Sequence, residues 1–90
     1  SDRLLFGESE AAYNRFYIKG KADPLQVRTT FKATLTILPT NQFIQIHRSF
    51  TVNKNAIEAV VGNELLIEGE RKLPVSRSFK PEIMSFLHDA

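Results

Sequence analysis

The sequence predicts a mostly β, antiparallel fold with two short helices, and three observations support this class. Runs rich in Val, Ile, Phe and Tyr recur along the chain, separated by Gly, Pro and Asn, which is typical of short strands joined by turns. Apolar residues with helical spacing occur at only two places. The chain has 90 residues, which predicts a single domain over residues 1–90.

The first part of the chain predicts strands. A short apolar run begins at residues 4–6 and is bounded by Gly7. Residues 14–18 include Phe, Tyr and Ile and therefore favour a strand. A turn over residues 20–24 leads to a further strand over residues 25–29, so these two strands are expected to form a hairpin.

The first helix is predicted directly after this hairpin. Thr29 or Thr30 can cap it, because a threonine hydroxyl accepts a hydrogen bond from a backbone N–H of the first turn. Pro39 ends it. The residues on its apolar stripe are Phe31, Leu35 and Leu38.

The second half of the chain predicts more strands and turns. In order, these are a strand-rich block at residues 43–52, apolar residues at 57–61 that lead to a turn at 62–63, a strand at 65–67, a turn at 68–70 and a strand at 73–75. The last two strands form a hairpin. Pro74 places the final strand at an edge or makes it irregular, because proline cannot donate to a ladder.

A second short helix is predicted at the C-terminal end. Ser76 or Ser78 can cap it, and Pro81 then lies near the first turn, where a missing N–H matters least. The residues spaced to be buried together are Ile83, Phe86 and Leu87.

Residue types that perform catalysis or bind metal are scarce. There is no cysteine, and the only histidines, His47 and His88, are far apart in the sequence. His47 and Ser49 lack the glycine-flanked serine turn of many hydrolases. We therefore expect no enzyme, no catalytic residue, no metal and no cofactor. Without an apolar run of about 20 residues, we also expect no membrane contact by this domain and a cytoplasmic location.

The charges are unevenly distributed although the net charge is only +2. Residues 15–54 hold seven basic residues against one aspartate, residues 55–70 hold four glutamates and no base, and residues 71–80 hold four bases and no acid. Such blocks can form a basic face that suits a polyanionic partner. Ordinary solvated strands of mixed charge are the alternative, and charge alone favours that alternative.

Three stretches together resemble one known family. They are residues 4–18, residues 27–39, and FIQIHRSFTVN at 43–53, which is followed by LPVSR at 73–77. This ordered set is similar to the LytTR family of DNA-binding domains, found at the C-terminus of many bacterial response regulators, and the similarity covers nearly the whole chain. It implies an elongated, mostly antiparallel β fold without a recognition helix, in which loops at strand ends enter successive major grooves on one face of the duplex.

The chain departs from the family pattern at three places. Family members usually begin with one more strand before the position of Leu4, and we expect this strand to be absent or trimmed here. A Gly-Asn pair often precedes the tyrosine matched by Tyr13, whereas this chain has Ala11 and Ala12. Many members have an arginine where Ser78 stands. The last two differences remove groups that could contact DNA.

The resemblance also implies partners and a larger context. Double-stranded DNA is the expected ligand, and binding to repeated sites as a homodimer is a further family expectation. The domain is expected to form the C-terminal part of a larger transcription regulator of a bacterial two-component system. A receiver domain or a membrane sensor domain would then precede it.

The implied base-reading residues lie in three loops. They are Arg48, Arg77, Tyr13 and Asn14. An arginine fork can bond guanine O6 and N7 together, which is worth about 1–3 kcal/mol of base discrimination. Each residue also has a structural alternative: a surface ion pair for Arg48, capping of the C-terminal helix for Arg77, packing for Tyr13, and stabilisation of its own turn for Asn14.

Other residues are expected to contact phosphates or to support the loops. The phosphate-contacting candidates are Arg15, Ser49, Ser76, Ser78 and Lys80. For Arg15 and Lys80 the alternative is a solvated side chain. His47 is expected to orient the Arg48 loop, and Asn53 to secure its own loop through hydrogen bonds to the backbone.

A different class of function stays open at this point. The chain could be a protein-interaction or dimerisation module on a small β scaffold. Such a module would use an exposed strand edge, or the acidic region of residues 58–70, to bind a partner.

Overall fold

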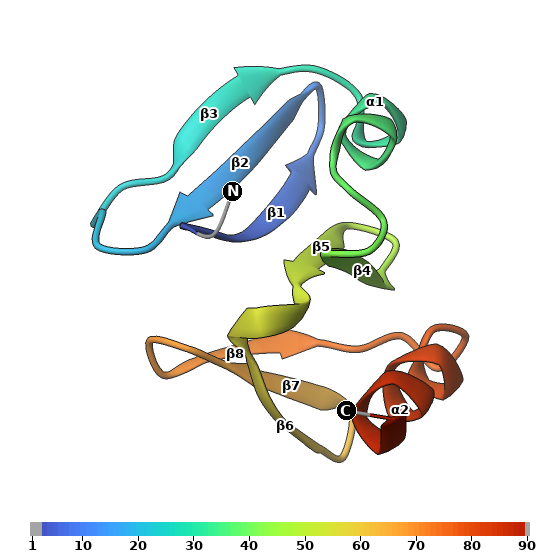
Figure 1. Cartoon of the computed structure of the whole chain (residues 1–90). Helices are drawn as coiled ribbons and strands as arrows, with labels where there is room; N and C mark the ends of the chain where they lie inside the picture. Colours follow the sequence, from blue (N-terminus) through green and yellow to red (C-terminus); the bar gives the residue numbers. More distant parts are fainter. Residues whose placement is uncertain (1–2, 90) are drawn as a thin grey trace.

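A computed structural model describes residues 3–89, and over these residues the chain forms two antiparallel sheets and two helices (Figure 1). The five-stranded sheet has the order β3-β2-β1-β5-β4, and the three-stranded sheet has the order β6-β7-β8. The elements are β1 (Leu4–Glu10), β2 (Tyr13–Ile18), β3 (Leu25–Arg28), α1 (Phe31–Ile37), β4 (Phe43–His47), β5 (Phe50–Asn53), the 3₁₀ turn η1 (Lys54–Ala56), β6 (Ile57–Val61), β7 (Glu64–Ile67), β8 (Arg71–Pro74) and α2 (Lys80–Asp89). The predicted fold class, mostly antiparallel β with two short helices, is confirmed.

β1 is longer than the sequence predicted, and it occupies the centre of its sheet. Gly7 was expected to end the apolar run, but the strand continues to Glu10 and pairs with β2 on one side and β5 on the other. The reason for the glycine is close packing, because a Cβ atom at Gly7 would lie 3.3 Å from a ring carbon of Phe16. The expected boundary at Gly7 was therefore wrong.

α1 begins and ends where the sequence placed it. Of the two candidate caps, Thr30 is the one used, and its hydroxyl accepts a hydrogen bond from the N–H of Ala33 at 3.1 Å. The N–H of Leu38 closes the last turn on the carbonyl of Thr34, and Pro39 follows. The helix lies at one end of the five-stranded sheet (Figure 1), and a hollow of about 260 Å³ lies between it and Phe16 of β2 and Val27 of β3.

The three-stranded sheet follows the predicted turns. Gly62 (φ 63°) lies in the β6–β7 turn and Gly69 (φ 88°) in the β7–β8 turn, a left-handed conformation that glycine adopts without steric cost. Pro74 ends β8, which is an edge strand as expected. The sequence indicated the turn after residues 57–61 but did not show that these residues form a complete strand, β6.

α2 lies against the core, but its start differs from the prediction. The helix begins at Lys80, and Phe79 directly precedes it, so neither Ser76 nor Ser78 takes the position before the helix. Pro81 is in the first turn, as expected, and Ile83 is fully buried. Phe86 and Leu87 pack against the same core. Within residues 3–89, no helix has the length and apolar character needed to span a bilayer.

The main core lies between the two sheets. Its buried residues are Leu5, Phe6, Ile44, Ile46, Val52, Ala56, Leu65, Ile67, Leu73, Val75 and Ile83. The rings of Phe6 and Tyr17 stack with their centroids 4.3 Å apart, and the Arg71 guanidinium lies 4.8 Å from the Tyr17 ring centroid. Burial and the nearby Glu8 carboxylate raise the pKa of the Tyr17 hydroxyl, which donates a hydrogen bond to Glu8.

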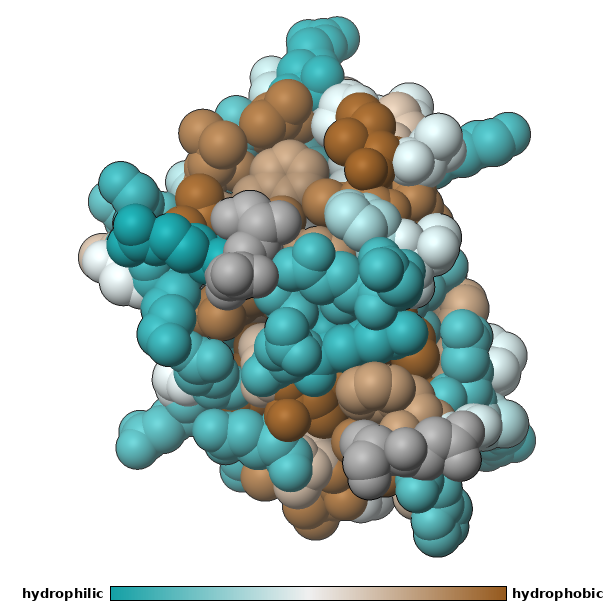
Figure 2. Space-filling model, in the orientation of Figure 1, coloured by the Kyte–Doolittle hydropathy of each residue, from teal (hydrophilic) through white to brown (hydrophobic). Residues whose placement is uncertain are grey.

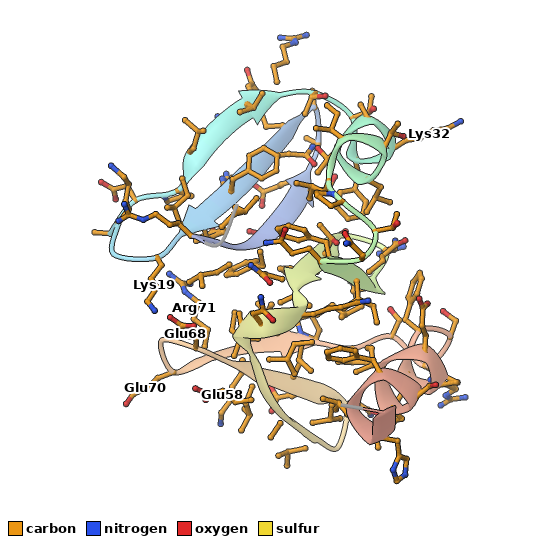
Figure 3. The ribbon with its side chains drawn as sticks, in the orientation of Figure 1. Lys19, Lys32, Glu58, Glu68, Glu70 and Arg71 are labelled. Atoms are coloured by element: carbon orange, nitrogen blue, oxygen red, sulfur yellow. The ribbon has the colours of Figure 1, made fainter. Side chains whose placement is uncertain are left out.

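An ion pair joins the two sheets at their periphery. Lys19, just after β2, lies 2.8 Å from a carboxylate oxygen of Glu68, which follows β7. Figure 3 shows Lys19 and Arg71 beside Glu68 at this edge. One glutamate of the acidic region at residues 58–70 is therefore paired with a lysine of the same chain.

Asn53 secures the connection between the two sheets. It is almost completely buried, its side-chain amide donates to the carbonyl of Leu4 at 2.9 Å, and its side-chain oxygen accepts from the N–H of Asn55 at 2.9 Å. The expected role of Asn53 in fixing its own loop is confirmed, and its bond to Leu4 extends that role to β1.

We predict that Asn53→Ala lowers the free energy of unfolding by about 1–3 kcal/mol, because it leaves two partly buried backbone groups without their partner. Chemical denaturation followed by circular dichroism measures the change. Asn41→Ala, at an exposed loop position, is the matched control and should leave the midpoint nearly unchanged. Equal stability of the two variants would contradict the anchoring role.

Candidate nucleic-acid interface

Three connections between elements lie along one side of the molecule. They are the β1–β2 turn, the β4–β5 turn and the loop from β8 to α2, which follow one another from the top to the lower right of Figure 1. The N–H of Ser9 donates to the carbonyl of Ser49 at 2.8 Å, and the N–H of Ser76 donates to the carbonyl of Ile46 at 2.9 Å. These two bonds place the middle connection directly beside the other two, although the three are far apart in the sequence. We call this set the three-loop side.

The β4–β5 turn holds Arg48 at an exposed position. The imidazole Nδ1 of His47 accepts the N–H of Ser49 at 3.1 Å, and the Gln45 side chain donates to the carbonyl of His47 at 3.1 Å. The His47 ring also packs edge-on against Phe50, with ring centroids 5.6 Å apart. His47 therefore shapes the turn that carries Arg48, which is the structural role that the sequence indicated.

The loop between β8 and α2 presents Arg77 and Ser78 to solvent. The N–H of Phe79 donates to the carbonyl of Ser76 at 3.0 Å, which folds the loop into a turn with Arg77 at its exposed part. Ser76 is half-buried, because its own N–H binds β4. Arg77 therefore projects from a loop that is tied both to β4 and to the start of α2.

The β1–β2 turn is tight and carries an exposed tyrosine. Ala11 and Ala12 form the turn, and Ala11 has φ of 54°, in the sparsely populated left-handed region. Tyr13 is 38% exposed. Its partner in the neighbouring strand is Arg28, which is also exposed.

Asn14 does not belong to the exposed part of this turn. Its side chain is 0% exposed, and its amide donates to the carbonyl of Thr29 at 2.9 Å. The expectation that Asn14 contacts a base is corrected, because a buried side chain bonded to the backbone cannot reach a base edge in this conformation. Instead, Asn14 connects the start of β2 to the end of β3.

The two long basic side chains proposed for phosphate contact have partners within the protein. Arg15 lies 2.7 Å from Glu10 and donates to the side-chain oxygen of Gln26 at 3.3 Å. The hydrogen bond and charge of Glu10 raise the pKa of the Arg15 guanidinium. The Lys80 ammonium donates to the carbonyl of Gly62 at 2.9 Å, in the β6–β7 turn. Either residue would have to exchange a contact within the protein for a phosphate.

The structure adds one basic residue that the sequence did not single out. Arg28 ends β3 opposite Tyr13, and the two residues after it line a hollow of about 400 Å³ beside the β1–β2 turn. Only the pairing register of β2 and β3 reveals this neighbourhood. Across residues 3–89, no group of three His, Asp or Glu side chains is arranged to hold a metal ion.

Comparison with known proteins identifies the arrangement. The fold is similar to a solved structure of the LytTr DNA-binding domain of a protein described as a methyl-accepting/DNA response regulator from Bacillus cereus. The two share 22% sequence identity with a TM-score of 0.83, over 96% of this chain and 82% of the other. The sequence description of the LytTr DNA-binding domain matches residues 2–88. The chain therefore belongs to the LytTr DNA-binding domain family.

Proposed function

We propose that this domain binds a specific double-stranded DNA site as the output domain of a bacterial transcription regulator, and that it performs no catalysis. The observation that carries the proposal is the three-loop side, where two backbone hydrogen bonds bring three exposed connections together. The Bacillus cereus relative has the same fold and is itself the DNA-binding domain of a response regulator.

Arg48 and Arg77 are the proposed base readers. Both are exposed, and both project from turns whose backbones are fixed by hydrogen bonds. A guanidinium presents donors in a fixed fork that matches O6 and N7 of guanine in the major groove. Tyr13 is the third candidate, since it is an exposed residue that directly follows the β1–β2 turn.

The phosphate contacts are assigned to side chains around these readers. The hydroxyls of Ser49, Ser76 and Ser78 lie in the same loops as the two arginines and can donate to phosphate oxygens. Arg15 and Lys80 take this role by exchanging their contacts within the protein. Arg28, beside Tyr13, joins the group.

The size of the domain fits loops that enter successive major grooves. The longest dimension of the molecule is 34 Å. One helical turn of B-DNA is about 34 Å long, which is also the distance between successive major grooves on one face. We propose that the two outer connections, the β1–β2 turn and the β8–α2 loop, enter neighbouring grooves, with the β4–β5 turn between them.

We further propose the context in which the domain acts. It forms the C-terminal part of a larger cytoplasmic regulator, with a receiver or a membrane sensor domain upstream. Two copies would occupy repeated DNA sites as a homodimer. The alternative function is a protein-interaction module that binds a partner through the acidic region of residues 58–70. The Lys19–Glu68 ion pair argues against it, because it already occupies one of these glutamates.

Selection from pooled random duplexes tests the proposal. A DNA reader should enrich a short sequence motif, and its affinity should fall as salt rises, with a slope of log K against log salt of about −0.9 for each phosphate contacted. Unselective binding that moderate salt abolishes would contradict a sequence-specific role.

We predict that Arg48→Ala and Arg77→Ala each weaken binding to the selected duplex by about 5- to 150-fold, which corresponds to 1–3 kcal/mol, because each loses a fork on guanine. Fluorescence anisotropy on selected and random duplexes measures the effect. Binding to random DNA should change much less. Lys21→Ala is the matched control, since Lys21 is exposed in the β2–β3 connection at the far end of β2 from Tyr13. Equal losses on both duplexes would remove the base-reading assignment.

We predict that His47→Ala weakens binding to the selected duplex, whereas His47→Asn retains most of it. The Oδ1 of asparagine lies as many bonds from Cα as Nδ1 of histidine, so it can accept the same Ser49 N–H. Anisotropy on the selected duplex and thermal melting of each variant separate positioning from stability. If both variants bind like the natural chain, the turn does not depend on this hydrogen bond.

A further inference from the structure

β3 is an open edge of the five-stranded sheet. The N–H of Thr29 donates to the carbonyl of Ala12, which continues the β2–β3 ladder. Backbone groups alternate in direction along an antiparallel strand, so those of Leu25, Val27 and Thr29 point to β2. The N–H and C=O groups of Gln26 and Arg28 therefore point away from the sheet, and within residues 3–89 no strand lies on that side of β3.

The opposite edge of the same sheet, unlike β3, accepts a hydrogen bond from another part of the chain. β4 is the other terminal strand, and the loop before α2 donates a hydrogen bond to it through the N–H of Ser76. This bond occupies part of the β4 edge, whereas within residues 3–89 the outward groups of β3 form no backbone hydrogen bond with another element.

An apolar surface accompanies the open edge. Hollows of about 260 and 320 Å³ lie on either side of Phe16, one toward α1 and one toward Leu25. Three large apolar side chains around them are exposed: Leu25 at 56%, Val27 at 37% and Ile37 at 78%. Figure 2 shows hydrophobic residues gathered over this upper part of the molecule. Such a patch beside an open edge is typical of an interaction surface.

We propose that β3 pairs with β3 of a second copy of this chain, antiparallel and centred on Val27. In this register Gln26 faces Arg28 of the second copy and Arg28 faces its Gln26, so all the outward N–H and C=O groups of these residues form four hydrogen bonds. The surface is therefore complementary to itself, which is what a two-fold interface requires.

The two neighbouring registers fit less well. A shift that places Gln26 opposite Gln26 pairs Arg28 with Pro24, which has no N–H to donate. A shift the other way places Arg28 directly opposite Arg28 of the second copy, and like charges in that position are destabilising. The centred register avoids both defects and brings the two Val27 side chains together on the apolar face.

The symmetry of this dimer determines the directions in which the three-loop sides of the two copies point. A two-fold axis between antiparallel strands is perpendicular to the sheet, so it reverses the direction of every strand. The three-loop sides of the two copies then point in opposite directions. This dimer is therefore a different one from the homodimer proposed on repeated DNA sites, and it needs no nucleic acid to form.

Cysteine cross-linking tests the register, because the natural chain has no cysteine. In the centred register the two Val27 residues form a non-hydrogen-bonded pair with Cα atoms about 4.5 Å apart, within the range that a disulfide spans. Val27→Cys should form a disulfide-linked dimer under mild oxidation at least tenfold faster than Leu25→Cys. Leu25 is the matched control, since it is more exposed than Val27 but faces Thr29 of the second copy. Faster linkage at Leu25, or equal rates, would overturn the proposed register.

Sedimentation equilibrium of the full chain without DNA tests the dimer itself. The natural chain and Gln26→Ala should dimerise as concentration rises, whereas Gln26→Pro should stay monomeric because it lacks the outward N–H. The ladder to β2 does not use that N–H, so thermal melting should show Gln26→Pro folded. A natural chain that is monomeric at every concentration would overturn the proposal, as would a dimer that persists in Gln26→Pro. Neither result would bear on DNA binding, which is measured separately.

Discussion

The backbone hydrogen bond from the N–H of Ser9 to the carbonyl of Ser49 holds the β4–β5 turn beside the end of β1, and the rest of the three-loop side depends on it. It extends the pairing of β1 with β5, so the β4–β5 turn lies beside the strand that leads into the β1–β2 turn. The bond from Ser76 to Ile46 then adds the third loop on the other side of β4. Because both bonds join backbone atoms, the arrangement depends on strand register rather than on particular side chains. Side chains at the loop tips can then differ while the loops keep their places.

The side chains proposed to contact bases and those proposed to contact phosphates have different physical requirements. Arg48 and Arg77 need exposure and a fixed backbone, and the structure gives both to each of them. Arg15, by contrast, is held by Glu10, so a phosphate must compete with a carboxylate 2.7 Å away. The open β3 edge lies on the opposite edge of the sheet from β4, so two kinds of contact can coexist in one small domain.

Local patterns in the sequence were sufficient to predict the elements, and long-range pairing accounts for the differences. The Thr30 cap and the role of His47 depend on residues within three positions, so the sequence was enough to indicate them. Gly7 was misread because its neighbour Phe16 lies on another strand. Asn14 was placed on the surface because its partner, the Thr29 carbonyl, is fifteen residues away. Arg28 was overlooked for the same reason, since only the register with β2 brings it beside Tyr13. The family resemblance supplied the three loops, and the structure showed that they lie together.

Methylation protection of a selected duplex tests base reading by Arg48 and Arg77, because dimethyl sulfate modifies guanine N7 in the major groove, where these arginines are proposed to bind. We expect protected guanine N7 atoms in the major groove where Arg48 and Arg77 bind. Arg48→Ala and Arg77→Ala should each expose a different guanine. Binding without any protected guanine N7 would contradict major-groove reading by the three-loop side.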